Sequence, residues 1–345
     1  MFLAIKRGLA FALAVIVSAG LLGACGKQPA GTATESGERK EATKMEEKTT
    51  LKVLTIGHSL AVDSGYMLSL IAAAEGYTGL TVGTLYYSGC SLSRHVQFMT
   101  EESREYRLYV SNSADVSNVR ETIDGITMLE AVQYTDWDVF ILQGSPFEVA
   151  TDATFSNGDI QTLQKFVNDN KRNPDTVFGW HLFWPMATDP ELVETHPTKP
   201  NPFMSRYEMM FDADRNKLYA ALADCTEKYI LTDETFSFVI PSGTAIENAM
   251  SGYLTEKDLI RDYAHATDLG RLIAGYTWFC TLRGIEELQE IKLRTVPNAY
   301  FKSTVSAEDW VLSDHQKALI LEAVNNALKN PLEITASQYT EAPAQ

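Results

Sequence analysis

The stretch from Leu51 to Ser64, LKVLTIGHSLAVDS, sets the expected fold of the chain. It begins with a short run of apolar and β-branched residues, which is typical of a strand buried in a parallel sheet. The run stops at Gly57, and a helical pattern follows from about Tyr66. A serine between such a strand and a helix lies at the carboxyl edge of the sheet, where open α/β folds place their chemistry. Ser59 is therefore a candidate nucleophile, although G-x-S alone also fits ordinary turn chemistry.

Further apolar runs resemble the first one. They are Leu80–Tyr87, Trp137–Leu142, Thr176–Pro185 and Phe236–Ile240. Strands that alternate with helices predict an α/β fold: a three-layer α/β/α, flavodoxin-like sandwich with a mostly parallel five-stranded sheet. Each run ends in small or polar residues, in the order GHS, SGCS, QGSP and PSGT for four of them. Because parallel strands end at one edge of the sheet, we expect a functional site at that edge.

Three longer segments interrupt this alternation. Residues 111–127 are expected to form an irregular surface insertion, and residues 189–202, which contain four prolines, are expected to form a loop. Residues 206–229 have the pattern of one long helix.

The N-terminus has the pattern of an export signal. The charged pair Lys6 and Arg7 precedes an apolar run over residues 8–22, which is too short for a membrane span and ends in small residues. The sequence LGAC that ends at Cys25 also resembles the lipobox of bacterial lipoproteins. We therefore expect residues 1–24 to be a lipoprotein signal peptide and Cys25 to carry a lipid anchor. An ordinary cleaved signal with an incidental cysteine is the alternative.

The remaining chain divides by composition. Residues 25–50 are rich in small and charged residues with little to bury, so they are expected to be a flexible linker. Residues 51–331 are long enough for one large domain, and residues 332–345 form a C-terminal tail. The expected localisation is extracytoplasmic, with the lipid holding the protein to the cell membrane.

Charge and cysteine content exclude several functions. The chain has 29 Lys and Arg against 45 Asp and Glu, a net charge of −16, and no basic cluster, so nucleic acid is not an expected partner. Without Cys25, the cysteines are Cys90, Cys225 and Cys280. Their odd number and spacing argue against a disulfide framework or a zinc site, and buried free thiols are favoured over a single pair. No common metal or nucleotide motif occurs, so no cofactor is expected.

The histidines supply a candidate base. A nucleophilic serine needs a histidine to take its proton and a carboxylate to orient that histidine. His265 follows Asp262 by three residues in a short segment before a helix that Thr267 or Asp268 would cap. A carboxylate at that distance reaches Nδ1 and leaves Nε2 free to face Ser59, although D-x-x-H alone is a common pattern. Three other histidines lack ligand spacing and are expected at the surface: His95, His196 and His315.

These residues together resemble a known family. The chain is similar to SGNH (GDSL-type) hydrolases, and in particular to the secreted bacterial branch DUF4886, over about residues 51–284. The resemblance rests on four blocks: IGHS, SGCSL, WDVFILQGS and DYAHATDLGRLIAG. It implies that Ser59 is the nucleophile, that Asp262 and His265 complete a triad, and that the N–H of Gly89 helps to hold an oxyanion.

The chain departs from the family pattern in two blocks. Position 58 is His where the family usually has Asp or Asn, and the side chain of His58 is expected to point away from the site. The third block usually reads G-x-N, with the Asn as an oxyanion donor, but here it is Gln143-Gly144-Ser145. Either Gln143 or Ser145 could take the place of the Asn, and Gln143 is favoured.

His181 and Trp184 resemble a His/Trp patch of the closer branch. One interpretation is a substrate-binding wall on which Trp184 stacks against a sugar ring. The other is a set of core aromatics with a satisfied histidine, and the sequence leaves both open.

The expected function is a serine esterase that hydrolyses O-acyl esters, in particular O-acetyl esters on carbohydrates, through an acyl-serine intermediate. The carbohydrate substrate rests on analogy with the family. The alternative is a non-catalytic glycan-binding lipoprotein on a decayed hydrolase scaffold. A lipase or thioesterase is less favoured, because the polar, proline-rich segment 189–202 does not suggest a wide apolar mouth.

Overall fold

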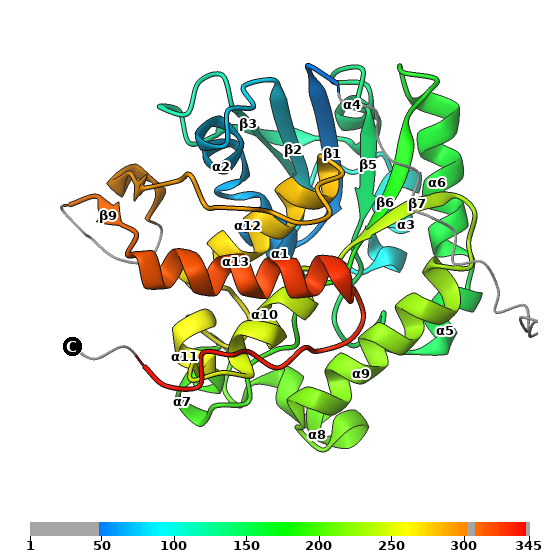
Figure 1. Cartoon of the computed structure of the whole chain (residues 1–345). Helices are drawn as coiled ribbons and strands as arrows, with labels where there is room; N and C mark the ends of the chain where they lie inside the picture. Colours follow the sequence, from blue (N-terminus) through cyan, green and yellow to red (C-terminus); the bar gives the residue numbers. More distant parts are fainter. Residues whose placement is uncertain (1–47, 302–307, 343–345) are drawn as a thin grey trace, which may run out of the picture. The chain divides into compact units, whose positions relative to one another are not determined.

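The computed structural model describes residues 48–301 and 308–342. Its main sheet has seven strands in the order β4-β3-β2-β1-β5-β6-β7 (Figure 1). The five predicted strands are all present and mutually parallel. They are β1 (Leu51–Gly57), β2 (Leu80–Tyr86), β5 (Val139–Leu142), β6 (Val177–His181) and β7 (Phe236–Ile240). The α/β class and the mostly parallel sheet are thus confirmed.

The first strand lies at the centre of the sheet. In β1, Val53 pairs with Val82 on one side and with Val139 on the other. All residues of β1 except Lys52 are buried. A strand covered on both faces has a continuous apolar run instead of an alternating pattern, and this run is the feature that predicts β1 from the sequence.

The sheet is larger than predicted, because residues 106–126 add two antiparallel strands to its edge. These are β3 (Tyr106–Asn112), which pairs with β2, and β4 (Glu121–Ile126), which pairs with β3. The expected irregular insertion at 111–127 is therefore wrong over β4. The strand was missed because an edge strand faces solvent, and only Ile126 of β4 is buried.

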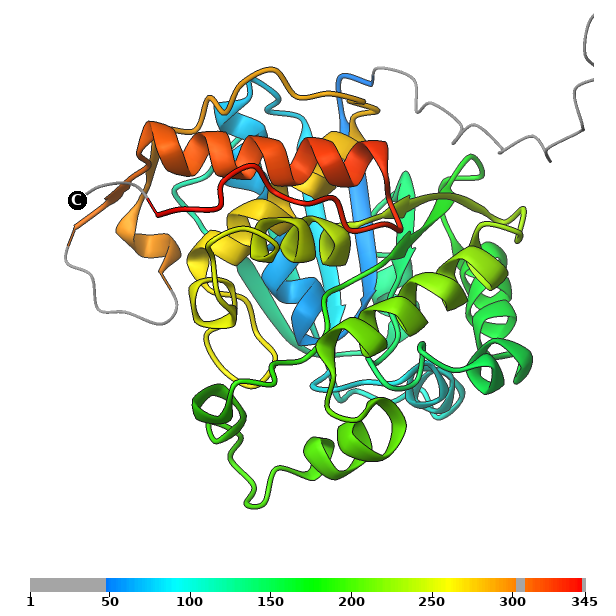
Figure 2. The same ribbon diagram turned by 60° about the horizontal axis from the view of Figure 1, so that its bottom comes forward.

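Two helical layers enclose the sheet (Figures 1 and 2). One layer contains α1 (Ser59–Gly65), α2 (Leu68–Ala74), α10 (Ser242–Met250), α12 (Asp268–Leu282) and, outside them, α13 (Asp314–Lys329). The other contains α3 (Leu92–Thr100), α4 (Met128–Val132), α5 (Asp152–Ser156) and α6 (Asp159–Asn170). This is the predicted three-layer arrangement.

The region between β6 and β7 differs from the prediction. Its helices are α7 (Pro190–Val193), α8 (Pro202–Phe211) and α9 (Arg215–Cys225), followed by the π-helical turn η1 (Thr226–Ile230). The single long helix is wrong because Asp212 and Ala213 have positive φ angles of 54° and 50°. Asp214 then starts α9 by accepting the N–H groups of Asn216 and Lys217.

Smaller elements complete the described chain. They are α11 (Glu256–Leu259), the hairpin of β8 (Thr295–Val296) and β9 (Trp310–Val311), and the 3-10 turn η2 (Asn298–Tyr300). The tail from residue 332 is bound to α10, since Asn248 Oδ1 accepts the N–H of Thr335 at 2.7 Å and the hydroxyl of Ser251 accepts that of Ser337 at 2.8 Å.

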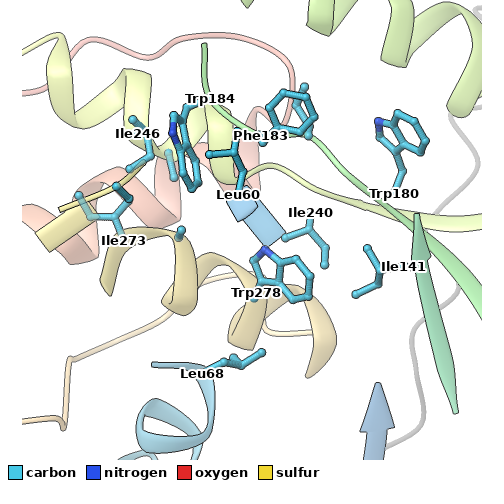
Figure 3. Close-up of a cluster of buried hydrophobic side chains, with 14 of the residues drawn as sticks. Leu60, Leu68, Ile141, Trp180, Phe183, Trp184, Ile240, Ile246, Ile273 and Trp278 are labelled. Carbon is cyan, nitrogen blue, oxygen red and sulfur yellow. The ribbon is translucent and has the colours of Figure 1, made fainter. Parts of the chain in front are cut away.

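The beginning of α1 is embedded in the main core. Leu60 belongs to the same buried cluster as Phe183, Trp184 and Trp278, whose side chains are at most 1% exposed (Figure 3). This packing fixes the turn that carries Ser59 against the helices and strands around it.

The export and anchoring predictions fall on residues 1–47, outside the described residues. Within the described ranges, no helix has the length and apolar character needed to cross a membrane.

Candidate active site

Ser59 is the first residue of α1 and follows β1 after a single intervening residue. The turn requires a glycine before it, because a Cβ on Gly57 would lie 2.8 Å from Oε1 of Gln143. Ser59 is partly exposed, unlike the residues that follow it in α1. As the first residue of a helix, it has a backbone N–H that donates no bond within the helix and is available to an anion.

His58 points into the protein, as expected. It caps α1: its Nδ1 accepts the N–H of Leu60 at 3.4 Å, so its Nε2 carries the proton and donates to the carbonyl of Gly144 at 3.0 Å. Burial lowers the pKa of His58 from 6.5 to about 4. A neutral ring with both nitrogens engaged cannot act as the base for Ser59.

Asp262 and His265 form a direct pair in the loop between α11 and α12. Nδ1 of His265 lies 2.9 Å from both carboxylate oxygens of Asp262. Asp262 also accepts the backbone N–H groups of Ala264 and His265, at 2.9 and 2.8 Å. Burial alone would raise the pKa of Asp262, but the bonds and charge of His265 outweigh it and lower the pKa from 3.8 to about 2. The carboxylate is therefore ionised and fixes the proton of His265 on Nδ1.

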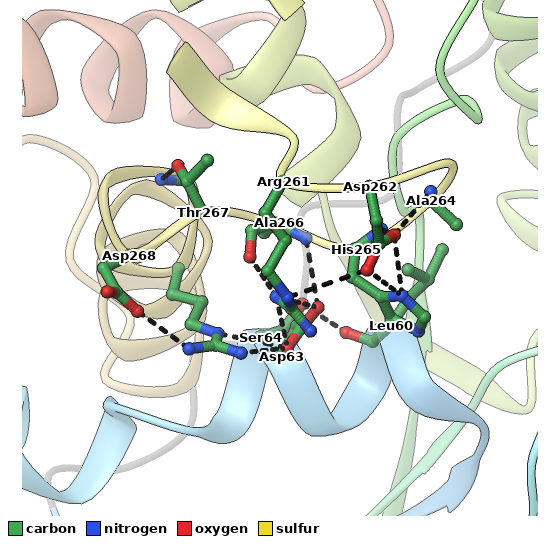
Figure 4. A network of polar contacts seen from close by, with 12 residues as sticks. Leu60, Asp63, Ser64, Arg261, Asp262, Ala264, His265, Ala266, Thr267 and Asp268 are labelled. Atoms are coloured by element: carbon green, nitrogen blue, oxygen red, sulfur yellow. Dashed lines mark hydrogen bonds and ion pairs between the residues drawn. The ribbon is translucent and has the colours of Figure 1, made fainter. Parts of the chain in front are cut away.

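The loop that carries this pair is closed on itself and on α1. Ile260 and Ala266 form an antiparallel bridge, and the N–H of Arg261 donates to the carbonyl of His265 at 2.8 Å. Thr267 caps α12 by accepting the N–H of Gly270, which confirms one of the two predicted caps. On the α1 side, the carboxylate of Asp63 bonds to this loop (Figure 4).

The loop faces the first turns of α1 (Figure 4). A positive charge on His265 would add to the effect of burial and lower the pKa of His58, the residue before Ser59. Within the described residues, no hydrogen bond joins the Ser59 hydroxyl to His265. Such bonds are often long without substrate and shorten when it binds.

Gly89 lies in the turn between β2 and α3. Its φ is +59°, a left-handed conformation that favours glycine, and a Cβ there would meet nothing within 4 Å. No hydrogen bond from its N–H is present among the described residues, so the group can donate to an acceptor from outside the chain.

Gln143 lies beneath the Ser59 turn. Its Oε1 accepts the N–H of His58 at 3.1 Å, and its Nε2 donates to Nδ1 of His181 at 2.8 Å. The side chain is 0% exposed. The alternative residue, Ser145, bonds through its N–H and its hydroxyl to Glu148 Oε2, at 3.1 and 3.3 Å. In this structure, Gln143 supports the turn from below, and its amide does not face solvent.

His181 and Trp184 do not form an accessible wall, and that interpretation needs correction. Both are 0% exposed. Trp184 donates from Nε1 to the carbonyl of Ala264 at 2.8 Å, so it supports the loop of Asp262 and His265 from inside. A sugar ring cannot stack on a tryptophan enclosed in the core. The alternative interpretation of core aromatics with a satisfied histidine describes the pair correctly.

A continuous set of hydrogen bonds runs from His181 to the serine turn. Because Nδ1 of His181 accepts from Gln143, its Nε2 donates to the hydroxyl of Ser64 at 3.3 Å, and Ser64 donates to the carbonyl of Leu60 at 3.0 Å. Burial lowers the pKa of His181 well below 6.5, which keeps the ring neutral and this order of donors intact.

Aromatic side chains lie beside the histidine loop. Tyr263 contacts His265 edge to face at 5.6 Å between ring centres, and it stacks with Phe203 of α8 at 6.1 Å. His196 lies 4.6 Å from the ring of Tyr263 and is 7% exposed. The expectation that His196 lies at the surface is wrong, because the α7–α8 segment folds against the loop.

The cysteines do not add a second nucleophile. Cys90, Cys225 and Cys280 are free and buried, as favoured from the sequence. Burial raises the pKa of Cys90, next to Gly89, to about 12, so its thiol stays protonated at neutral pH.

The fold and these contacts define an α/β protein with a mostly parallel sheet and a serine and a histidine–aspartate pair at its carboxyl edge. The chain belongs to the DUF4886 family, a domain of unknown function, whose model matches residues 52–309.

Two solved structures are similar to this chain, and the first of them supports the fold. The chain is similar to a DUF4886 family protein from Bacteroides uniformis, with 23% identity, 85% of this chain and 100% of that chain covered, and a TM-score of 0.66. It also resembles a candidate SGNH hydrolase from Slackia heliotrinireducens, with 14% identity, coverage of 68% and 99%, and a TM-score of 0.41. A comparison with curated proteins finds no match.

Proposed function

We propose that this protein is a serine esterase that hydrolyses O-acyl esters through an acyl-serine intermediate. The observation that carries the proposal is the Asp262–His265 pair. Its 2.9 Å contacts occupy Nδ1 of His265 and leave Nε2 as the ring nitrogen that can take a proton. The loop that carries the pair faces α1, which begins at Ser59. A base whose proton position is fixed by a carboxylate is what a serine nucleophile requires.

In the proposed mechanism, the Ser59 oxygen attacks the acyl carbonyl while its proton passes to Nε2 of His265. Asp262 stabilises the imidazolium that forms. The carbonyl oxygen becomes an oxyanion, held by the N–H groups of Ser59 and Gly89. The intermediate then collapses: the ester C–O bond breaks, and His265 gives its proton to the departing alkoxide. In the second half of the reaction, water attacks the acyl-serine carbonyl and gives its proton to His265. The bond between the acyl carbon and the Ser59 oxygen then breaks, His265 returns the proton to Ser59, and the acid is released.

Gln143 has a supporting position in this scheme. Its amide oxygen holds the N–H of His58 and thereby the turn before Ser59. One of its two amide hydrogens is used by His181, so a role as third oxyanion donor requires the other hydrogen and a movement that exposes it.

The proposed substrate is an O-acetyl or related O-acyl group on a carbohydrate, by analogy with surface-attached members of the SGNH fold. The proposed location is outside the cytoplasm, with Cys25 lipidated and the linker 25–50 holding the domain near the membrane. Both proposals come from the sequence.

The test is hydrolysis of p-nitrophenyl acetate and of acetylated sugars by the detergent-purified full chain, beside its Ser59→Ala variant. Loss of the rate in the variant, with fluorophosphonate labelling at Ser59 in the wild type, would support the esterase. The control is Ser117→Ala, which removes a hydroxyl bonded locally to Asp115 and should keep the wild-type rate. Equal rates in Ser59→Ala and wild type, or no hydrolysis and no labelling, would favour a glycan-binding protein without catalysis.

A further inference from the structure

Asp63 links the helix of Ser59 to the loop of the histidine. It lies four residues after Ser59, one turn further along α1. Its side chain is 2% exposed. It accepts from Arg261 Nη1 at 3.2 Å, from the N–H of Ala266 at 3.0 Å, and from Nε and Nη2 of Arg271 at 3.1 and 3.0 Å. Figure 4 shows these contacts converging on Asp63.

The partners of Asp63 stand at both ends of the catalytic segment. Arg261 immediately precedes Asp262, and Ala266 immediately follows His265. Arg261 also donates to the carbonyl of Ala266, which ties the two ends together. One carboxylate on α1 therefore binds the residues that flank the segment of the proposed base on both sides.

The charges make this link specific to a carboxylate. Arg271 is 0% exposed and its guanidinium is divided between Asp63 and Asp268, the latter at 2.8 Å. A buried charge that loses its partner is strongly unfavourable, so a neutral residue at position 63 would force the arginines or the loop to move.

We propose that Asp63 is a positioning residue. It holds the segment of Asp262 and His265 against the beginning of α1, so that His265 can take the proton of Ser59. The inference rests on the proposed function and names a further residue that it needs. Asp63 touches neither the substrate nor the reacting atoms. It acts through Arg261 and the backbone of Ala266.

The first test is Asp63→Asn in the full chain. A displacement of catalytic groups by about 1 Å can cost about 100-fold in rate, so kcat should fall by roughly that factor. KM should change little, because Asp63 does not bind the substrate, and fluorophosphonate labelling of Ser59 should slow in parallel. Wild-type kcat in a folded Asp63→Asn would overturn the proposal.

A matched control separates positioning from general loss of stability. Glu75 is also a buried carboxylate bound to α12: its side chain is 3% exposed, and it accepts from the hydroxyl of Tyr276 at 3.0 Å and the N–H of Lys292 at 2.9 Å. Glu75→Gln should be destabilised yet keep kcat. If both variants lost kcat equally, the effect would be one of stability and the proposal would fail.

A second variant covers the case in which Asp63→Asn does not fold. Arg261 is 21% exposed, and Arg261→Met removes its bond to Asp63 together with the 3.7 Å ion pair between its Nε and Asp262, while Arg271 still neutralises Asp63. We expect kcat to fall by about tenfold at constant KM, and an unchanged kcat would overturn the proposal. Ser59→Ala is measured in parallel to separate failure of the positioning role from failure of the proposed esterase mechanism. If Ser59→Ala keeps wild-type activity, the esterase mechanism is wrong, whatever the variants of Asp63 and Arg261 show.

Discussion

The side-chain oxygen of Gln143 lies 3.1 Å from the backbone nitrogen of His58, the residue directly before Ser59. Through this bond, the end of β5 fixes the turn at the end of β1. The same contact requires glycine at position 57, where a Cβ would meet that oxygen.

Replacing Gln143 by leucine should lower both stability and activity. The N–H of His58 and Nδ1 of His181 would be left buried without partners, which costs about 1–3 kcal/mol for each group. Urea unfolding and ester hydrolysis should be measured together. A loss of about 10²–10³ in rate with full stability would instead indicate an oxyanion donor. Gln164→Leu is the control, since among the described residues that buried amide bonds to Thr235 alone.

Asp262→Asn should lower kcat by about 10⁴, because an amide does not fix the proton of His265 on Nδ1. The loss should persist across the pH range in which the wild type works, since Asp262, with its pKa of about 2, is already ionised there. Steady-state rates between pH 5 and 9 check this. A nearby carboxylate that only caps α11, Asp258, provides the control as Asp258→Asn. Wild-type rates in Asp262→Asn would refute the assigned role.

Trp184→Phe should destabilise the protein without changing KM for an acetylated sugar. The variant keeps an aromatic ring but loses the 2.8 Å bond to the carbonyl of Ala264, a loss of about 1–3 kcal/mol. Thermal unfolding and sugar kinetics are the measurements. Trp180→Phe, another buried tryptophan, serves for comparison. A raised KM in Trp184→Phe alone would revive the stacking interpretation.

Stability should fall in mild acid. Burial lowers the pKa of His58 to about 4 and that of His95 to about 3, and lowers that of His181 well below 6.5. Between pH 6.5 and 4, the unfolded chain therefore binds more protons than the folded one, and the free energy of unfolding decreases as pH falls. Each histidine contributes up to about 1.4 kcal/mol per pH unit.

Urea unfolding at pH 7, 6 and 5 checks this dependence. His95→Gln should reduce the slope by about a third, because one of the three groups is removed. Equal free energies of unfolding at pH 7 and pH 5 would contradict the expectation.

Structural features that are formed by residues close together in the chain could be predicted from the sequence. The buried run of β1 and its serine turn could be predicted, and so could the 262–265 pair, because three residues in a turn bring a carboxylate to Nδ1. The parallel core of the sheet followed from apolar runs that alternate with helices.

Features made by distant partners could not be predicted. His95 was expected at the surface, but it is 0% exposed because Tyr106 of β3 stacks on it and bonds to Nδ1 at 2.7 Å. Asp63 could not be predicted for the same reason, although one signal was present: it is the one charged residue of α1, a helix that is buried from Leu60 onward. Its arginine partners are known only once the fold is known.

The hydrogen bond from Ala266 to Asp63 spans 203 residues of sequence. At translation rates of about 5–20 residues per second, about 10–40 s pass between synthesis of the serine helix and synthesis of its counterpart. Under the proposed mechanism, the nascent polypeptide carries its nucleophile without a base throughout that interval. A chain that stalls or is cut before this point has no esterase activity under that mechanism, so the appearance of activity would report synthesis beyond Ala266.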